Sequence, residues 1–150
     1  MRLSRKCDYA LRALILMASR DDGGYHNIAT IAKEEDIPLR YLEQVFLALK
    51  NAGILSSKSG PMGGYKFRRT PSEINLVDIV RTIDGPVAPA RCVSHTAYEK
   101  CPREAVCALR PVLSDVRDAI AEILKSITLA DACKRVKVAT NPPVGGGNEV

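Results

Sequence analysis

Three cysteines stand close together in the second half of the chain. Cys92, Cys101 and Cys107 fall in the stretch "ARCVSHTAYEKCPREAVCALRP" (90–111), with eight and five residues between neighbours. The residues around them show neither a helical nor a strand periodicity, so we expect an irregular loop. Thiolates bind metals and act as nucleophiles, so this loop is where the chain could do chemistry.

A structural disulfide is a disfavoured use of these cysteines. The basic and apolar N-terminus is interrupted by Asp8 and Arg12 and lacks a cleavage site, so it predicts a helix of the fold and not a signal peptide. No apolar run is long enough to span a bilayer, and we expect no membrane partner. The predicted location is therefore the cytoplasm, where thiols stay reduced.

Metal chemistry and catalysis make different demands on the loop. Structural zinc usually takes four ligands in close pairs such as C-x2-C, and no close pair is present. A catalytic cysteine needs an activating histidine, and only His26 and His95 exist, without a pocket motif, so we expect no enzyme. An iron–sulfur cluster accepts widely spaced thiolates and a fourth ligand that is not cysteine. The residues favour a cluster but leave zinc or plain reduced thiols open.

The first half of the chain predicts the element that such a loop would serve. Apolar spacing indicates a helix over residues 5–19, a short helix in "NIATIAKEE" (27–35) and a third helix from Pro38 to a stop at Gly53. The third helix should bury the stripe Leu39, Leu42, Phe46 and Leu49. Two helices joined by the tight "DIP" break are typical of a helix-turn-helix.

A wing follows this pair of helices. "ILSSK" (54–58) and "YKFRRT" (65–70) have strand character, and "SGPMGG" (59–64) is a turn-rich connector. The fold class we predict is mainly α, a winged helix-turn-helix with a two-stranded β wing and a long C-terminal helix.

The long helix needs a surface to cover it. It should run from Pro111 to about Ile127, after a short helix in "NLVDIVRTIDG" (75–85), and it carries the stripe Val112, Val116, Ala119, Ile120, Ile123 and Ile127. This stripe either folds back on its own domain or packs against a second copy. A short helical turn is expected near Thr128, and the composition of residues 135–150 predicts a disordered tail.

Charge is concentrated in the first half. Residues 1–69 contain 12 Lys and Arg against 7 Asp and Glu, whereas residues 70–150 contain 10 of each, so the whole net charge of +5 lies before residue 70. A basic half-domain favours a polyanionic partner such as double-stranded DNA.

The third helix and the wing supply the side chains that could read DNA. Away from the apolar stripe lie residues whose side chains can pair with base edges or phosphates, and basic residues flank the wing. These candidates are Arg40, Tyr41, Glu43, Gln44 and Lys50 on the helix, and Lys58, Lys66, Arg68 and Arg69 at the wing.

The segments "YALRALILMA", "IATIAKEEDIPLRYLEQVFLALKNAGIL" and "GPMGGYKFRRTPSEINLVDIVRTIDG", followed by three cysteines and a long helix, resemble the Rrf-type winged-helix transcriptional regulators. This family includes the iron–sulfur regulator IscR, the nitric-oxide sensor NsrR, the iron regulator RirA and the clusterless CymR. The resemblance covers about residues 1–130. It implies a homodimer formed by the long helix, base reading by Glu43 and Gln44, and a cluster, 2Fe-2S or 4Fe-4S, on Cys92, Cys101 and Cys107.

The resemblance also bears on the fourth ligand. IscR-like members supply a histidine three residues after the last cysteine, where this chain has Arg110. NsrR-like members supply an aspartate from the N-terminal helix of the partner subunit, which corresponds to Asp8 here, and the first cysteine gap is longer than usual. The resemblance therefore implies Asp8, with His95 and Cys7 as runners-up.

The expected function is a transcriptional regulator, a repressor of a palindromic operator, that senses redox, nitric-oxide or iron status through its cluster. Residues 1–84 would bind DNA, 85–110 would hold the cluster, 111–134 would dimerise and 135–150 would form the tail. The alternative is a clusterless or zinc-stabilised winged-helix regulator whose cysteines are structural.

Overall fold

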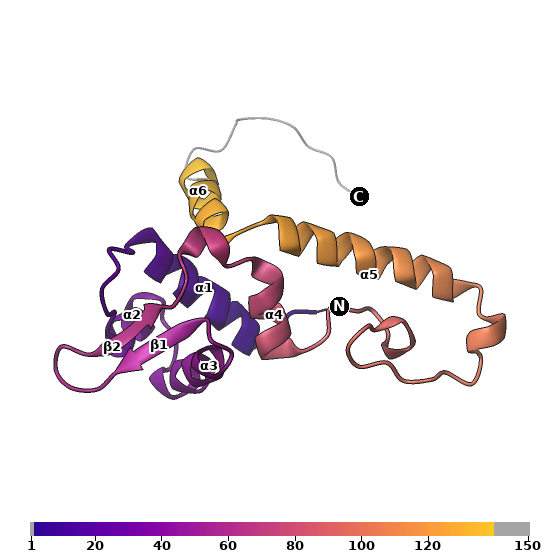
Figure 1. Ribbon diagram of the computed structural model, residues 1–150, viewed down its shortest axis with the longest axis horizontal. Coiled ribbons are helices and arrows are strands. Elements are labelled where there is room, and N and C mark those ends of the chain that lie inside the picture. The colour runs from indigo at the N-terminus through magenta and orange to yellow at the C-terminus, as the bar shows by residue number, and fades with distance from the viewer. Residues whose placement is uncertain (1, 140–150) are drawn as a thin grey trace.

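The computed structural model describes residues 2–139, which form six α-helices, three short 3-10 turns and one two-stranded sheet. The helices are α1 (Arg5–Ser19), α2 (Ile28–Glu34), α3 (Leu39–Asn51), α4 (Leu76–Asp84), α5 (Leu109–Ser126) and α6 (Leu129–Ala139). The strands are β1 (Leu55–Lys58) and β2 (Gly64–Phe67), and the 3-10 turns are η1 (Pro71–Glu73), η2 (Arg91–Val93) and η3 (Glu104–Val106). α1 to α4 and the sheet form one body, from which α5 extends along the long axis (Figure 1).

Local capping sets the starts of the first two helices. The Oγ of Ser4 accepts a hydrogen bond from the N–H of Cys7 at 3.1 Å, and Oδ1 of Asn27 accepts one from the N–H of Ala29 at 2.8 Å. Such caps satisfy N–H groups that have no acceptor inside the helix. The helices then bury their apolar faces in one core, which includes Ala10, Leu14, Met17, Ile31, Leu42, Phe46, Leu49, Ile54, Leu55 and Leu129.

The expected stripe on α3 is right except at its first member. Leu42, Phe46 and Leu49 are buried, but Leu39 is 40% exposed and Val45 is buried in addition. Leu39 is the first residue of α3, directly after Pro38, where the helix has not yet entered the core. The apolar pattern therefore extended one turn too far toward the N-terminus.

The wing is an antiparallel hairpin that is tied back to the helix-turn-helix. Ser56 pairs with Lys66, and Lys58 pairs with Gly64. On the other edge of β2, Tyr65 exchanges two backbone hydrogen bonds with His26, at 2.8 and 2.9 Å. The ring of Tyr65 also meets that of Phe46 edge to face, with centroids 5.0 Å apart, so the wing and α3 share one packed base.

The C-terminal helices differ from expectation in their bounds. α5 begins at Leu109, two residues before Pro111, because proline is tolerated in a first helical turn where the N–H has no acceptor. α6 runs to Ala139, so the expected short turn ending at residue 134 is a full helix that packs on α1 and η1. Residues 140–150, the rest of the expected tail, lie outside the described part of the chain.

The starts of α4 and α6 are fastened to each other. The N–H of Leu76 donates to the carbonyl of Ile127 and the N–H of Leu129 donates to that of Ile74, both at 2.9 Å. This bridge fixes the C-terminal end of α5 to the core. Among residues 2–139, no helix is both long enough and apolar enough to cross a bilayer.

Candidate DNA interface and cysteine loop

One face of α3 is free of the core. Arg40, Tyr41, Glu43, Gln44 and Lys50 are all exposed, as the sequence predicts. The guanidinium carbon of Arg40 lies 5.1 Å from the centroid of the Tyr41 ring, so a cation–π contact holds the two side chains together. A helix face that combines guanidinium, phenol, carboxamide and carboxylate groups can read base edges in a major groove.

The basic residues of the wing have different environments. Lys58, Arg68 and Arg69 are exposed, whereas Lys66 is half-buried. The ammonium of Lys66 lies 4.9 Å from the ring centroid of Tyr25, which limits where that charge can point.

Tyr25 is a member of this surface that sequence reasoning missed. It reaches β2 only because the neighbouring His26 pairs with Tyr65, and this pairing joins segments 39 residues apart in the chain. No local pattern indicates such a contact.

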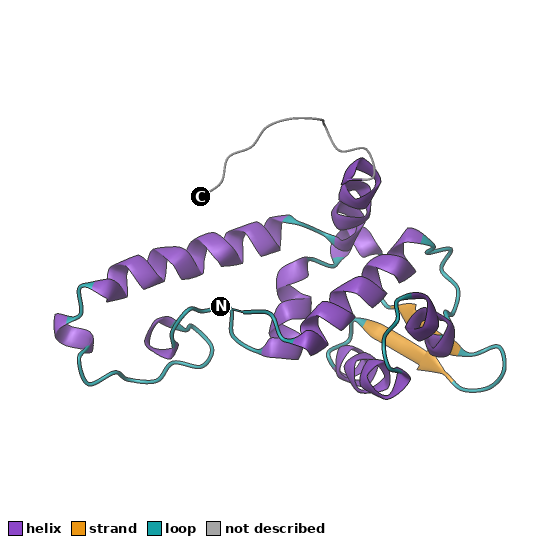
Figure 2. Ribbon diagram, turned by 180° about the vertical axis from the view of Figure 1, so that it is seen from behind, coloured by secondary structure: helices purple, strands orange, loops and turns teal. Residues whose placement is uncertain are grey.

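The cysteine loop lies at the opposite end of the molecule from the wing (Figure 1). Figure 2 shows the same loop from behind, running alongside α5, and η2 packs on that helix. Cys92 is the middle residue of η2, Cys101 precedes η3 and Cys107 follows it directly. All three are half-buried free thiols, and no disulfide forms among the cysteines of residues 2–139.

A single chain does not gather these thiols around one ion. Within residues 2–139, no three His, Cys, Asp or Glu side chains come close enough together to hold a metal. The donor chemistry nevertheless suits a cluster, because three accessible thiols on an irregular loop are what cluster iron binds. A cluster would require the loop to draw its three cysteines together.

Two ion pairs and a hydrogen bond hold the loop in its present shape. Arg91 pairs with Glu99 across the turn after Cys92. Between the second and third cysteines, Glu104 accepts a hydrogen bond from the Tyr98 hydroxyl at 2.7 Å and pairs with Arg110 at 2.8 Å. The hydrogen bond from Tyr98, and then the charge of Arg110, lower the pKa of Glu104. The pair of Arg91 and Glu99 is exposed on both sides and so contributes little to holding the loop, whereas Glu104 is only 20% exposed.

The expected fourth ligands occupy three different environments. Asp8 is 57% exposed in the first turn of α1, with its only ion pair to Arg12 at 3.6 Å within the described chain. Cys7 is fully buried against Val77, Val80 and Val87, and burial, together with the charge of Asp84, raises the pKa of its thiol to about 12. Asp8 is therefore open to solvent, whereas Cys7 is a protonated core residue.

His95 and Arg110 complete the comparison of candidates. The Nε2 of His95 lies 3.8 Å from Oδ1 of Asp118 on α5, and the imidazole is exposed. Arg110 is committed to Glu104 and offers no lone pair to a metal.

The comparisons with known proteins agree with this architecture. Residues 3–135 match the family model of Rrf2, described as an iron-dependent transcriptional regulator. An rrf2-like helix-turn-helix transcriptional regulator of Rhodobacter capsulatus is 36% identical over 135 residues, which cover 86% of this chain and 90% of the relative.

Two solved structures are similar over most of the chain. The structure of CymR, described as the global cysteine regulator of B. subtilis, matches with a TM-score of 0.77 at 32% identity, over 90% of this chain and 98% of CymR. That of T. potens IscR matches with a TM-score of 0.73 at 27% identity, over 95% of this chain and 93% of IscR.

These matches confirm the predicted fold class and the resemblance to the Rrf-type regulators. They also confirm that the protein is not an enzyme, because the family and its structural neighbours are transcriptional regulators. The chain belongs to the Rrf2 family of winged-helix, DNA-binding transcriptional regulators.

Proposed function

We propose that this protein is a cytoplasmic, homodimeric repressor that senses redox, nitric-oxide or iron status through an iron–sulfur cluster on Cys92, Cys101 and Cys107. The observation that carries the proposal is the placement of three free, half-buried thiols on one loop beside α5, in a chain whose other end has a free basic helix face and wing. In this account residues 1–84 bind DNA, 85–110 hold the cluster and 111–134 dimerise.

DNA reading is assigned to the exposed face of α3. Glu43 and Gln44 would contact base edges, with Arg40 and Tyr41 beside them where the helix enters the groove. Lys50, Lys58, Lys66 and Arg68 would neutralise phosphates, which gives affinity and register but no sequence information.

Dimerisation is assigned to α5 because its two faces differ. Ile120 and Leu124 pack toward α4, but Val112, Val116 and Ile123 are 55%, 41% and 59% exposed. Together with Leu109 and Ala119, these exposed residues recur at alternating spacings of three and four, which is the pattern of a helix-on-helix seam. A second copy that covers this row with its own would form a two-fold dimer and present two α3 helices to a palindromic operator.

The thiolates of the three cysteines would hold the cluster, and Asp8 of the partner subunit would complete its coordination. When bound, such a cluster supplies a redox-active centre that oxygen, nitric oxide or iron loss can destroy. A carboxylate is a harder and weaker ligand for cluster iron than a thiolate, so coordination through Asp8 makes loss of the cluster easier. That suits a sensor.

The direct test is metal and sulfide analysis of anaerobically purified protein, with its visible spectrum. We expect iron, acid-labile sulfide and broad absorption at about 400 nm, and all three should be lost in the Cys92→Ala, Cys101→Ala and Cys107→Ala variants. The matched control is Cys133→Ala, which removes a thiol that lies on α6 and outside the loop. A colourless protein without iron would contradict the proposal.

A second candidate is a clusterless or zinc-stabilised regulator. Two observations favour it: the three thiols are not gathered around one ion in the single chain, and the similarity to CymR extends over nearly its whole length. Zinc without sulfide in the same metal analysis, or no metal and unchanged DNA affinity on cysteine substitution, would select this candidate.

A further inference from the structure

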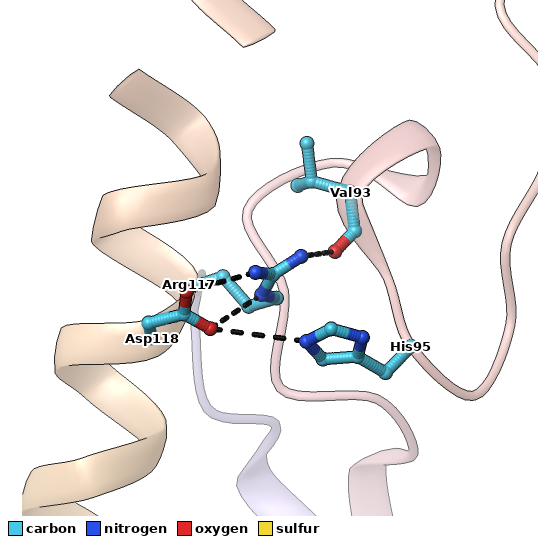
Figure 3. A network of polar contacts seen from close by, with 4 residues as sticks. All are labelled: Val93, His95, Arg117 and Asp118. Carbon is cyan, nitrogen blue, oxygen red and sulfur yellow. Dashed lines mark hydrogen bonds and ion pairs between the residues drawn. The ribbon is translucent and has the colours of Figure 1, made fainter. Parts of the chain in front are cut away.

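Arg117 on α5 makes an unusual set of contacts with the cysteine loop. Its Nη1 donates to the backbone carbonyl of Val93 at 2.5 Å, while Nε and Nη2 donate to the two carboxylate oxygens of Asp118 at 2.8 and 2.9 Å (Figure 3). The side chain is only 13% exposed. Two hydrogen bonds to one carboxylate fix the plane of a guanidinium group. The direction of the third hydrogen bond, from Nη1 of Arg117 to Val93, is therefore fixed as well.

The carbonyl that Arg117 holds belongs to the residue after Cys92. Val93 ends η2, its N–H donates to the carbonyl of Ala90 at 3.2 Å and its side chain is 2% exposed. The backbone that carries Cys92 is therefore held from two sides, by its own 3-10 turn and by α5.

The same carboxylate reaches the loop a second time. Asp118 lies 3.8 Å from Nε2 of His95, which follows Cys92 by three residues (Figure 3). The hydrogen bonds between Arg117 and Asp118 raise the pKa of the guanidinium and lower that of the carboxyl, so both groups stay charged across the ordinary pH range.

The other polar ties of the loop have both side chains exposed or hold a different part of it. The pair of Arg91 and Glu99 is 73% and 60% exposed, and so is screened by solvent. Arg110 acts through Glu104, on the segment between Cys101 and Cys107. In the described chain, Arg117 is the only side chain of α5 that hydrogen-bonds the backbone beside Cys92.

We propose that Arg117 is a positioning residue that fastens the Cys92 arm of the loop, the 3-10 turn Arg91–Val93, to the helix α5. The inference rests on the proposed function for the role of Cys92, because it assigns the residue that orients this thiol toward the cluster site. Movement of the Cys92 arm is then passed to α5 through the guanidinium of Arg117, whereas Cys101 and Cys107 can move without moving Arg117.

The test measures thiol reactivity in the full-length, metal-free protein. Trypsin separates the three cysteines, since Arg91, Lys100 and Arg103 lie between or before them. The time course of N-ethylmaleimide labelling can therefore be followed for each cysteine by mass spectrometry. In Arg117→Ala, Cys92 should react about tenfold faster than in the wild type, the factor expected for the loss of one hydrogen bond to a charged group.

Two further variants make the result specific. Lys125→Ala removes an exposed cation from the same helix and should leave all three rates unchanged. Arg117→Lys keeps the positive charge but cannot donate two hydrogen bonds to Asp118 in the same way. It should give a Cys92 labelling rate between those of the wild type and Arg117→Ala. If the alanine variant does not fold, the lysine variant alone provides the test. Unchanged Cys92 reactivity, or an equal increase at all three cysteines, would overturn the proposal.

Failure here is distinguishable from failure of the proposed function. If wild-type protein contains no cluster but Arg117→Ala accelerates Cys92 labelling, the positioning role stands and the cluster proposal falls. If the wild type binds a cluster but its Cys92 labelling does not depend on Arg117, the positioning role alone falls.

Discussion

Gly64 is a residue at which the attachment of the wing depends on the absence of a side chain. Its φ is +142°, and an added Cβ would lie 2.2 Å from the carbonyl oxygen of His26. This is the oxygen that accepts the N–H of Tyr65, so the close approach that joins the wing to the helix-turn-helix requires glycine.

Gly64→Ala should therefore destabilise the fold by about 3 kcal/mol, through backbone strain together with the clash. Urea unfolding of purified protein measures the change. Gly60→Ala is the matched control, because φ is +102° there but nothing lies within 4 Å of the added carbon, and about 1 kcal/mol is expected. Equal losses of unfolding free energy at the two positions would mean that the close approach of Gly64 to His26 does not restrict residue 64.

Lys66 provides a second test at the scale of one side chain. Lys66→Ala should weaken binding to every DNA sequence alike and make the slope of log affinity against log salt less negative by about one, because one phosphate contact is lost. Fluorescence anisotropy across a salt series measures this slope. Glu43→Ala should instead change which DNA sequence is preferred. If the slope for Lys66→Ala equals that of the wild type, Lys66 makes no phosphate contact and the wing assignment is wrong.

Sequence reasoning succeeds at single residues where the cause is local. The starts of the helices predicted in residues 27–35 and 75–85, which Asn27 and Asn75 cap, and the glycine-rich wing turn are fixed by hydrogen bonds and backbone angles within a few positions. It fails at Leu39 and at Tyr25, whose exposure and contacts depend on segments far away in the chain. Arg117 was missed for the same reason.

Among the elements, α5 and α6 carry the consequences for assembly. The sequence pattern predicts that the apolar stripe of α5 is one surface with one partner, but in the structure the stripe is divided between two faces of the helix. Ile120 packs on α4 within the chain, and Val112, Val116 and Ile123 face away from it. Periodicity marks an apolar stripe but does not tell which partner covers which part of it.

Val116→Asp should dissociate the proposed dimer, because it places a charge in the centre of the exposed row. Self-association should weaken by about a hundredfold, as for a central interface residue. Analytical ultracentrifugation measures this change, and thermal unfolding of the monomer should hardly alter since Val116 is 41% exposed. Lys125→Asp, on the same helix but outside the row, should leave the dimer intact. A Val116→Asp dimer of unchanged affinity would exclude this face.

The first turn of α6 has a carboxylate whose charge supports the helix. Asp131 accepts hydrogen bonds from the side chain and backbone of Thr128 at 2.7 and 3.2 Å, which lower the pKa of Asp131. A group whose pKa is lowered by folding adds stability above its unfolded pKa, and this stability is lost as the pH falls through the folded value.

Asp131→Asn should accordingly lower the urea midpoint at pH 7. The difference from wild type should shrink as the pH falls below about 4, where the unfolded chain binds a proton, and should vanish below the lowered pKa of the folded state, where Asp131 is protonated in both states. Urea titrations at pH 7 and pH 3 give the two differences. A difference that does not depend on pH would show that the ionised form of Asp131 makes no contribution.

The extent of α6 could be only partly foreseen. Thr128 and Asp131 mark its start, but its continuation to Ala139 is supported by packing on α1, at the other end of the chain. Tertiary contacts provide most helical stability in proteins, and a pattern of a few residues does not contain them.

In the whole molecule, the cysteine loop and the wing lie at opposite ends of the long axis (Figure 1). A signal at the loop must therefore pass through α5, α4 and α1 of one chain, or cross to a second copy. The proposed dimer offers the shorter route, since Asp8 lies on α1, which packs against α3. Coupling then means that the two states of the loop favour different arrangements of the two α3 helices.

For the whole molecule, a sequence predicts the features that lie within one chain. The winged helix and the cysteine loop follow from patterns within the chain and from its resemblance to the family. The fourth ligand does not, because Asp8 and Cys92 belong in this account to different subunits. Geometry between copies leaves no periodicity in a sequence.

Sensing through the cysteine loop requires that DNA affinity differ between cluster states, and a binding measurement tests this. An operator is first selected from random duplex DNA with anaerobic protein. Its affinity is then measured for the cluster-loaded protein, for the metal-free protein and for the variant with Cys92, Cys101 and Cys107 all changed to Ala. The affinity of the loaded protein should differ from that of the other two by about tenfold or more, and those two should agree. Equal affinity in all three would contradict sensing through the cysteine loop.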